Sequence, residues 1–318
     1  MPTTKKLLCA ALAAVTMIAL AACSNGSAAT PSAADSAASS AAPEPTATIA
    51  AGTDGTVPLG DRPFTLAVPP GYDPAKPVPL VLSLHGYTSY GKGTAGWLGL
   101  TGQARAQGFL LAMPDGTLDS QGQRYWNATD GCCDFDGANV DDDAYLTTVI
   151  TTVQKLYAVD PARIFVIGHS NGGFMALRMA CNHSDLVSAA VSVAGEMPAD
   201  ASGCKPGHPV SVLQVQGDAD ESIHYGGGTG GTGNHYPGAL ETVADWQSLD
   251  QCGATPTQGT ADYEASIPGA ETTTQAWECA DGTEVGLWTT AKGSHVPNLS
   301  PQFAPDVTAW MLAHARQG

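Results

Sequence analysis

Residues 163–177, which read RIFVIGHSNGGFMAL, constrain the fold more than any other segment. A run of β-branched and aromatic residues comes first, then GHSNG centred on Ser170, then a run of helix-forming residues. A serine in Gly-x-Ser-x-Gly between a strand and a helix is typical of a sharp turn that exposes its hydroxyl. The two glycines let neighbouring backbone approach that turn closely. A tight strand-to-helix connection without a chemical role is the alternative for this segment alone.

The rest of the chain alternates strands with helices. Short apolar runs that end at turn residues predict strands at 79–84, 108–113, 163–167, 186–193, 210–215 and 284–289. Helical patterns fall at 142–156, 171–180, 239–249 and 304–315. This alternation predicts an α/β fold in which helices cover both faces of a mostly parallel sheet.

Chain order selects the partners that Ser170 would need. A serine hydroxyl is a poor nucleophile unless a histidine, oriented by a carboxylate, removes its proton. In the α/β-hydrolase fold the order is serine, acid, histidine, each at the carboxyl edge of the sheet. Of the eight histidines, His295 is the one that follows the last predicted strand on a loop. The acid should follow the strand at 210–215, where we favour Asp220 and keep Asp218 as the alternative.

Two backbone N–H groups would complete such a site by holding a developing oxyanion. One is expected from Asn171, directly after the serine, and the other from the loop after residues 84–86, which makes Tyr87 the candidate. His169 and Trp126 are candidates for substrate contact. Trp126 could stack on an aromatic acyl group or a sugar ring, and packing in the interior is the equally compatible alternative.

The N-terminus carries a targeting pattern. Lys5 and Lys6 precede an apolar run that ends in LAAC at Cys23, so residues 1–22 are expected to be a secretory signal. LAAC resembles the bacterial lipobox, which predicts lipidation of Cys23 and membrane attachment by that anchor, with cleavage alone as the alternative. Residues 23–55 are mostly Ala, Ser, Thr and Pro, typical of a flexible linker. The folded domain is therefore expected in residues 56–318.

Six further cysteines fit an exported protein, because an even number in an oxidising compartment favours disulfides. We expect Cys181 to pair with Cys204 and Cys252 with Cys279, each bond contributing about 3 kcal/mol in the loop-entropy model. The pairing of Cys132 and Cys133 stays open, since adjacent α-carbons lie about 3.8 Å apart, below the usual disulfide range. No paired CxxC or HExxH spacing supports a metal site, and no metal or cofactor is expected.

The charge excludes one class of partner. Thirty acidic residues against thirteen basic ones give a formal net charge of −17. Such a surface repels phosphate backbones, and no basic cluster offsets it, so the sequence predicts no nucleic-acid binding. We expect a monomer.

From about residue 62 to the C-terminus the chain resembles the secreted polyhydroxybutyrate depolymerase and feruloyl esterase group, related to carbohydrate esterase family one and to LpqC-type lipoproteins. The matching pieces, in order, are residues 84–86, Trp126 with Cys132 and Cys133, residues 140–142, 168–173, 217–220, 225–227 and His295. The resemblance implies an α/β-hydrolase fold and a serine esterase whose triad is Ser170, Asp220 and His295. It implies substrates among feruloyl or acetyl esters of plant polysaccharides, short hydroxyalkanoate esters and polyhydroxybutyrate oligomers.

Two positions depart from that group. Val296 stands where members often carry tryptophan, and Tyr87 stands where cysteine or glycine is common. Both border the expected cleft, so they leave substrate choice open. No polymer-binding module follows the predicted domain, which argues against efficient attack on solid polyester. A lipid-anchored binding protein and an adhesion module with an inactive hydrolase fold are the alternatives from other classes.

Overall fold

The computed structural model describes residues 48–316 and has a parallel sheet at its centre. The six central strands, all parallel, are β4 (Leu110–Met113), β3 (Val78–Leu84), β7 (Val159–His169), β8 (Ala189–Val193), β9 (Ser211–Gly217) and β14 (Glu284–Thr290). Since they are parallel, their carboxyl ends meet at one edge of the sheet. The expected signal at 1–22 and Cys23 lie outside the described residues.

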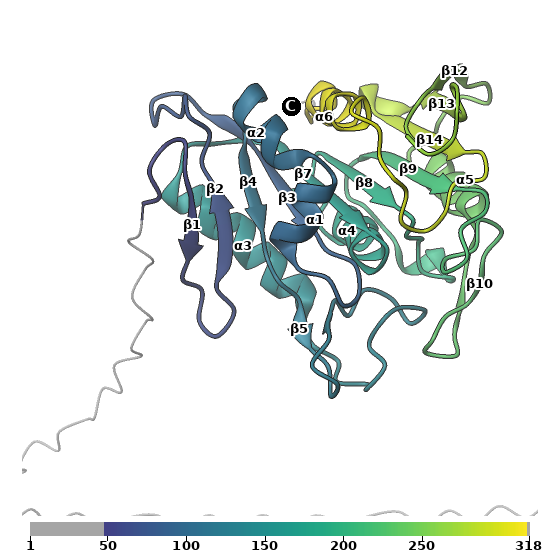
Figure 1. Cartoon of the computed structure of the whole chain (residues 1–318), viewed down its shortest axis with the longest axis horizontal. Coiled ribbons are helices and arrows are strands. Elements are labelled where there is room, and N and C mark those ends of the chain that lie inside the picture. The colour runs from purple at the N-terminus through teal and green to yellow at the C-terminus, as the bar shows by residue number, and fades with distance from the viewer. Residues whose placement is uncertain (1–47, 317–318) are drawn as a thin grey trace, which may run out of the picture. The chain divides into compact units, whose positions relative to one another are not determined.

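Antiparallel strands extend the sheet on both sides. They are β1 (Asp54–Val57) and β2 (Phe64–Ala67) beside β4, and β13 (Thr272–Glu278) and β12 (Thr257–Ala261) beside β14. The complete order is β1-β2-β4-β3-β7-β8-β9-β14-β13-β12 (Figure 1). Two small hairpins lie apart from this sheet: β5 (Thr117–Leu118) with β6 (Arg124–Tyr125), and β10 (Gly228–Thr229) with β11 (His235–Tyr236).

Helices cover both faces of the sheet, as Figure 1 shows. On one face lie α1 (Gly91–Trp97), α2 (Leu100–Gln107) and α6 (Phe303–Ala313). On the other lie α3 (Asp142–Leu156), α4 (Asn171–Asn182) and α5 (Ala239–Leu249). Short 3-10 turns span Ala201–Gly203 and Ala280–Gly282.

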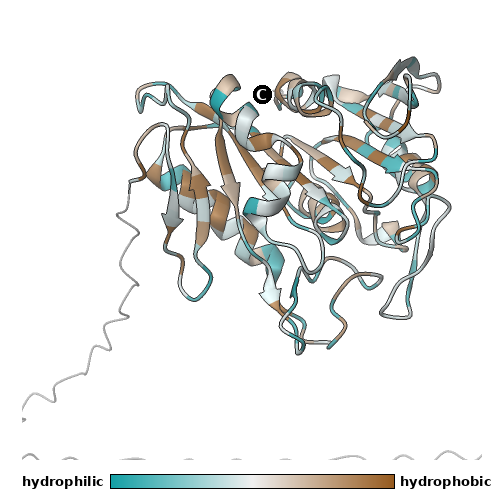
Figure 2. Cartoon of the chain, viewed as in Figure 1, coloured by the Kyte–Doolittle hydropathy of each residue, from teal (hydrophilic) through white to brown (hydrophobic). Residues whose placement is uncertain are grey.

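The strand sequences explain the two cores. Along β3, Leu80 and Leu82 point into the core beneath α3 and α4, while Val81 points into the core beneath α1, α2 and α6. Successive side chains of a strand alternate between faces, and a strand buried on both faces therefore reads as an unbroken apolar run. Figure 2 shows the hydrophobic residues gathered on these central strands.

The structure confirms the α/β architecture and each of the strands and helices expected from the sequence, with ends that differ by a few residues. Two boundaries need correction. The strand expected at 186–193 begins at Ala189, because residues 184–187 form a turn in which Leu186 and Val187 donate to His183. The predicted linker end at residue 55 is too late, because β1 begins at Asp54 and the Ile49 amide donates to the Tyr157 hydroxyl at 2.7 Å.

Three disulfides join the six cysteines of the folded part. Cys181 pairs with Cys204 and Cys252 with Cys279, which confirms both expected pairs. Cys132 and Cys133 are bonded to each other, which resolves the pairing left open by the sequence. In the described part of the chain, no helix combines the length and apolar character needed to cross a membrane.

Candidate active site

The turn between β7 and α4 places Ser170 at the carboxyl edge of the sheet. Ser170 has φ 52° and ψ −122°, a backbone conformation that non-glycine residues seldom adopt. Glycines on both sides make the turn possible. A Cβ on Gly168 would lie 2.8 Å from the Gly173 nitrogen, and one on Gly172 would lie 2.6 Å from the His85 carbonyl oxygen. Backbone strain of this kind is typical of functional sites.

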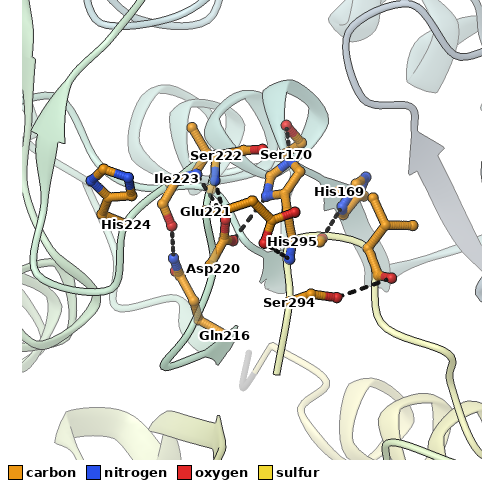
Figure 3. A network of polar contacts seen from close by, with 12 residues as sticks. His169, Ser170, Gln216, Asp220, Glu221, Ser222, Ile223, His224, Ser294 and His295 are labelled. Carbon is orange, nitrogen blue, oxygen red and sulfur yellow. Dashed lines mark hydrogen bonds and ion pairs between the residues drawn. The ribbon is translucent and has the colours of Figure 1, made fainter. Parts of the chain in front are cut away.

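His295 joins Ser170 to Asp220, as Figure 3 shows. His295 Nε2 is 2.9 Å from Ser170 Oγ, and His295 Nδ1 is 2.8 Å from Asp220 Oδ2. An ionised carboxylate only accepts hydrogen bonds, so Nδ1 carries the ring proton and Nε2 is left as the acceptor for the serine hydroxyl. The three residues follow β7, β9 and β14, and the sheet brings them together across 125 positions of sequence.

Asp220 is fixed by its own turn. Its Oδ1 accepts from the amides of Ser222 and Ile223, both at 2.8 Å, and its side chain is fully buried. Asp218, the alternative acid, points elsewhere and accepts from the Lys292 amide at 2.6 Å. It therefore braces the loop that leads to His295, while Asp220 contacts the imidazole.

The two candidate amide donors, Asn171 and Tyr87, lie beside Ser170. As the first residue of α4, Asn171 has an N–H group with no acceptor inside the helix. The loop after β3 lies against the sharp turn between β7 and α4 that carries Ser170, which we call the elbow, since a Cβ on Gly86 would be 3.3 Å from Ser170 Cβ. The next residue, Tyr87, lines the same pocket as Ser170.

His85, which chain order set aside, orients this loop. Its Nδ1–H donates to the Gly86 carbonyl at 2.8 Å, and its Nε2 accepts from the Gly116 amide at 2.8 Å. These two bonds fix both the tautomer and the ring plane. Burial lowers the pKa of His85 and keeps the ring neutral. In a trans peptide, holding the Gly86 carbonyl also sets the direction of the Tyr87 N–H on the opposite side.

The sequence left two roles open for Trp126, substrate contact and packing in the interior, and the structure shows packing. Its side chain is fully buried, with Nε1 donating to the His85 carbonyl at 2.9 Å. The Asn171 side chain holds the Trp126 backbone on both sides, accepting from its amide at 2.6 Å and donating to its carbonyl at 2.8 Å. Trp126 thus ties the elbow to the loop after β3, and a burial of this kind carries no signature in a single sequence.

The acidic cluster at 141–143 supports the same region. Asp142 is fully buried, pairs with Arg62 at 2.7 Å and accepts from the Asn127 amide at 2.7 Å. The Arg62 guanidinium lies 3.7 Å from the Tyr145 ring centroid. Asp141 caps α3 by accepting from the Ala144 amide. Both aspartates therefore have structural partners.

The pocket beside Ser170 has a volume of about 390 Å³, within the range typical of small-molecule sites. Its walls include Tyr87, Trp97, His169 and Val296. The Tyr87 hydroxyl donates to Asp119 at 2.6 Å, and that bond raises the pKa of Tyr87 to about 12.

A larger groove of about 660 Å³ beside Arg178 contains none of Ser170, His295 and Asp220. Within residues 48–316 no three His, Cys, Asp or Glu side chains are placed to hold a metal.

Comparison with known proteins identifies the family. Residues 57–259 match a family described as "Putative esterase". The chain is 30% identical over 230 residues to the putative esterase NocK of Nocardia uniformis subsp. tsuyamanensis, covering 66% of this chain and 63% of that protein. It is 27% identical over 244 residues to feruloyl esterase B of Piromyces equi, covering 74% and 42% respectively. The chain thus spans less than two thirds of the length of these relatives.

Among solved structures, an acetyl xylan esterase from Aspergillus awamori is similar in fold. The TM-score is 0.60 at 16% identity, covering 82% of this chain and 99% of that one. At that identity the likeness concerns the fold, which agrees with an α/β hydrolase. The family match covers most of the folded chain, including the turns that carry Ser170 and Asp220. The chain therefore belongs to the putative esterase family.

Proposed function

We propose that this protein is a serine esterase that hydrolyses carboxylic esters through an acyl-enzyme. The observation that carries the proposal is the hydrogen-bonded chain from Ser170 Oγ through His295 to Asp220, at 2.9 and 2.8 Å. A serine on a strained turn, a histidine in the right tautomer and an orienting carboxylate are the parts that acyl transfer needs. Family membership supports the same reaction class.

The mechanism has two matched halves. His295 Nε2 takes the Ser170 proton as Oγ bonds to the ester carbonyl carbon, and the amides of Tyr87 and Asn171 hold the resulting oxyanion. The carbon–oxygen bond to the alcohol then breaks, and Nε2 returns the proton to the departing alcohol. Water repeats the sequence, giving a proton to Nε2 and its oxygen to the acyl carbon, and Ser170 is restored.

Within this class we propose feruloyl or acetyl esters of plant polysaccharides as substrates. The relatives named feruloyl esterase and the neighbour named acetyl xylan esterase support that choice. The aromatic walls Tyr87 and Trp97 fit a flat acyl group. Short hydroxyalkanoate esters are the second candidate, because nothing at the pocket excludes a small aliphatic acyl chain. Comparison of kcat/KM for methyl ferulate, acetylated xylan and hydroxybutyrate oligomers ranks the candidates, and a preference for the oligomers would reject the first.

The decisive experiment is labelling with a fluorophosphonate probe. Wild-type protein should be labelled, and Ser170→Ala should lose the label and lower turnover by at least about a thousandfold, because the nucleophile is gone. Ser248→Ala, an exposed serine on α5, is the control and should be labelled like wild type. Labelling that survives in Ser170→Ala would reject the proposal. So would a purified wild-type protein that hydrolyses none of these esters.

We also propose that the protein works outside the cytoplasm, held to a membrane by a lipid on Cys23. The signal-like residues 1–22 and the disulfides of the folded part support this location. Detergent-phase partitioning that is lost in Cys23→Ser tests it, and partitioning that is the same in both proteins would argue against the anchor.

A further inference from the structure

His169, the residue before the nucleophile, has no part in the proton transfers described above. The residue is only 9% exposed, and its Nε2 is 2.9 Å from the backbone carbonyl oxygen of His295. A carbonyl oxygen only accepts, so Nε2 must carry the ring proton and donate. Nδ1 faces Gly86, where a Cβ would lie 3.1 Å away. Figure 3 shows this contact between the elbow and the loop that carries His295.

Trp97 supplies a second donor to the same loop. Its Nε1–H donates to the Pro297 carbonyl at 3.3 Å, and its ring lies edge-on to His169 with centroids 4.7 Å apart. The His169 ring thus lies between Trp97 and His295, whose ring centroid is 5.0 Å away. Two side chains from α1 and β7 therefore hold carbonyls on both sides of Val296.

The loop needs such anchors because it lies outside regular structure. It runs from the end of β14 at Thr290 to the start of α6 at Phe303, and Val296 at its tip is 60% exposed. Other bonds hold the loop away from the His295 carbonyl: among them, Lys292 donates to Asp218 and Asn298 donates to Glu264. Asp220 holds the His295 ring through Nδ1, and the bond from His169 holds the His295 backbone through its carbonyl oxygen.

We infer that His169 is a positioning residue, which acts through its Nε2–H bond to the His295 carbonyl to hold the base in line with Ser170, with Trp97 as a weaker second brace. The inference rests on the proposed serine esterase function. In this role His169 helps to place the general base His295. The sequence had instead suggested that His169 contacts substrate.

The neutral state of His169 is part of this role. Burial, followed by the charge of His295, lowers the pKa of His169 to about 4, while the hydrogen bond to the His295 carbonyl and then the charge of Asp220 oppose that shift. A cation here would oppose the positive charge that His295 acquires during the reaction. A ring that stays neutral can donate to the carbonyl without this repulsion.

Three variants distinguish the effect of the His169 Nε2–H hydrogen bond from the effect of packing by the His169 ring. His169→Phe keeps a flat ring without the N–H, and we expect kcat to fall about 10- to 100-fold with KM changed less than about threefold, since small misplacements cost that much. His169→Gln places an amide donor near the position of Nε2 and should recover most of the loss. Trp97→Phe should lower kcat by less than His169→Phe. His208→Phe, at an exposed histidine, is the control and should match wild type. Thermal melts confirm that each variant is folded.

Nitrogen-15 NMR of the histidine rings tests the contact without using activity. The ring signal that disappears in His169→Gln should belong to a neutral Nε2–H tautomer at pH 6. A different tautomer, an unchanged kcat in His169→Phe, or a His169→Gln variant as impaired as His169→Phe would overturn the inference while leaving wild-type esterase activity intact. Absence of fluorophosphonate labelling and of ester hydrolysis in wild type would instead overturn the proposed function, and with it any role for His169 in placing a base.

Discussion

Asp218 and Asp220 lie two positions apart, and their different partners give a direct test at the level of single residues. Asp220→Asn should lower kcat by about 10³- to 10⁴-fold, because an amide in place of the carboxylate favours the wrong tautomer of His295. Asp218→Asn should lower it less than about tenfold, because the Asn oxygen can still accept from the Lys292 amide. Steady-state kinetics of the two variants, with melts to confirm folding, decide between the acids. Equal losses, or a larger loss in Asp218→Asn, would contradict the assignment to Asp220.

The sequence predicted residues well where chain order alone determines the answer. The positions of Ser170 and His295 follow from the strand–turn–helix pattern and from the rule that the histidine comes last. The sequence favoured Asp220 but kept Asp218 as the alternative, because which aspartate reaches the imidazole depends on turn geometry. For Trp126 the sequence left substrate contact and interior packing equally open, because a tryptophan that packs against an active site looks the same in sequence as one that lines it, and the structure shows that it is buried. His85 was missed because its contacts are to backbone atoms.

At the level of elements, the packing of α4 against the sheet depends on glycine. Gly172→Ala should destabilise the protein by several kcal/mol or prevent soluble expression, because the added Cβ would overlap the Leu84 and His85 carbonyls at the end of β3. Gly102→Ala is the matched control on α2. No atom lies within 4 Å of its Cβ position, so the alanine should stabilise the helix by about 0.5–1 kcal/mol. Urea denaturation measures both, and a Gly172→Ala protein as stable as wild type would show that the elbow can relax.

Helices and strands could be predicted where burial of one or both faces imposes a pattern of apolar residues on the sequence. The central strands and α3 to α6 are apolar on the faces they bury, and their residue patterns show it. The two helices that the sequence did not predict, α1 and α2, contain four glycines between residues 91 and 102, which lowers helix propensity. Strand β12 is mostly exposed and β13 is mostly half-buried, and both are rich in Thr and Gln, so no apolar run marks them. They form by antiparallel pairing with β14, a long-range contact that local patterns do not report.

At the scale of the whole molecule, the groups of the proposed mechanism all lie at one edge of the sheet. Segments after β3, β7, β9 and β14 supply the second amide donor, the nucleophile, the acid and the base of the proposed mechanism. Parallel strands all end at that edge, so distant parts of the chain meet without any special contact between them. Away from Ser170, the fold also buries the carboxyl groups of Glu196 and Asp250, whose side chains are inaccessible to solvent. Burial raises the pKa of both, so the stability of the fold should depend on pH.

Asp250, which follows α5, gives the clearer prediction. Its Oδ1 accepts from the Val210 amide at 3.4 Å, and burial raises its pKa from 3.8 to about 7. Well below pH 3.8 both the folded and the unfolded states hold the proton, so burial of Asp250 does not lower the stability of the folded state through ionisation. Between about pH 4 and 7 the unfolded state releases the proton first, so stability falls as pH rises through that window, and the cost is constant above it.

Asp250→Asn removes this pH-dependent cost, because an amide stays neutral. In urea denaturation the variant and wild type should be about equally stable at pH 4. By pH 8 the variant should be more stable by a few kcal/mol, at most about 4, which is the free energy of moving one proton across that pKa difference. Glu241→Gln, at an exposed carboxyl on the same helix, should show no such widening. If the gap between Asp250→Asn and wild type were the same at pH 4 and pH 8, Asp250 would be ionised in the folded protein, and its burial would have to be offset by a partner other than the Val210 amide.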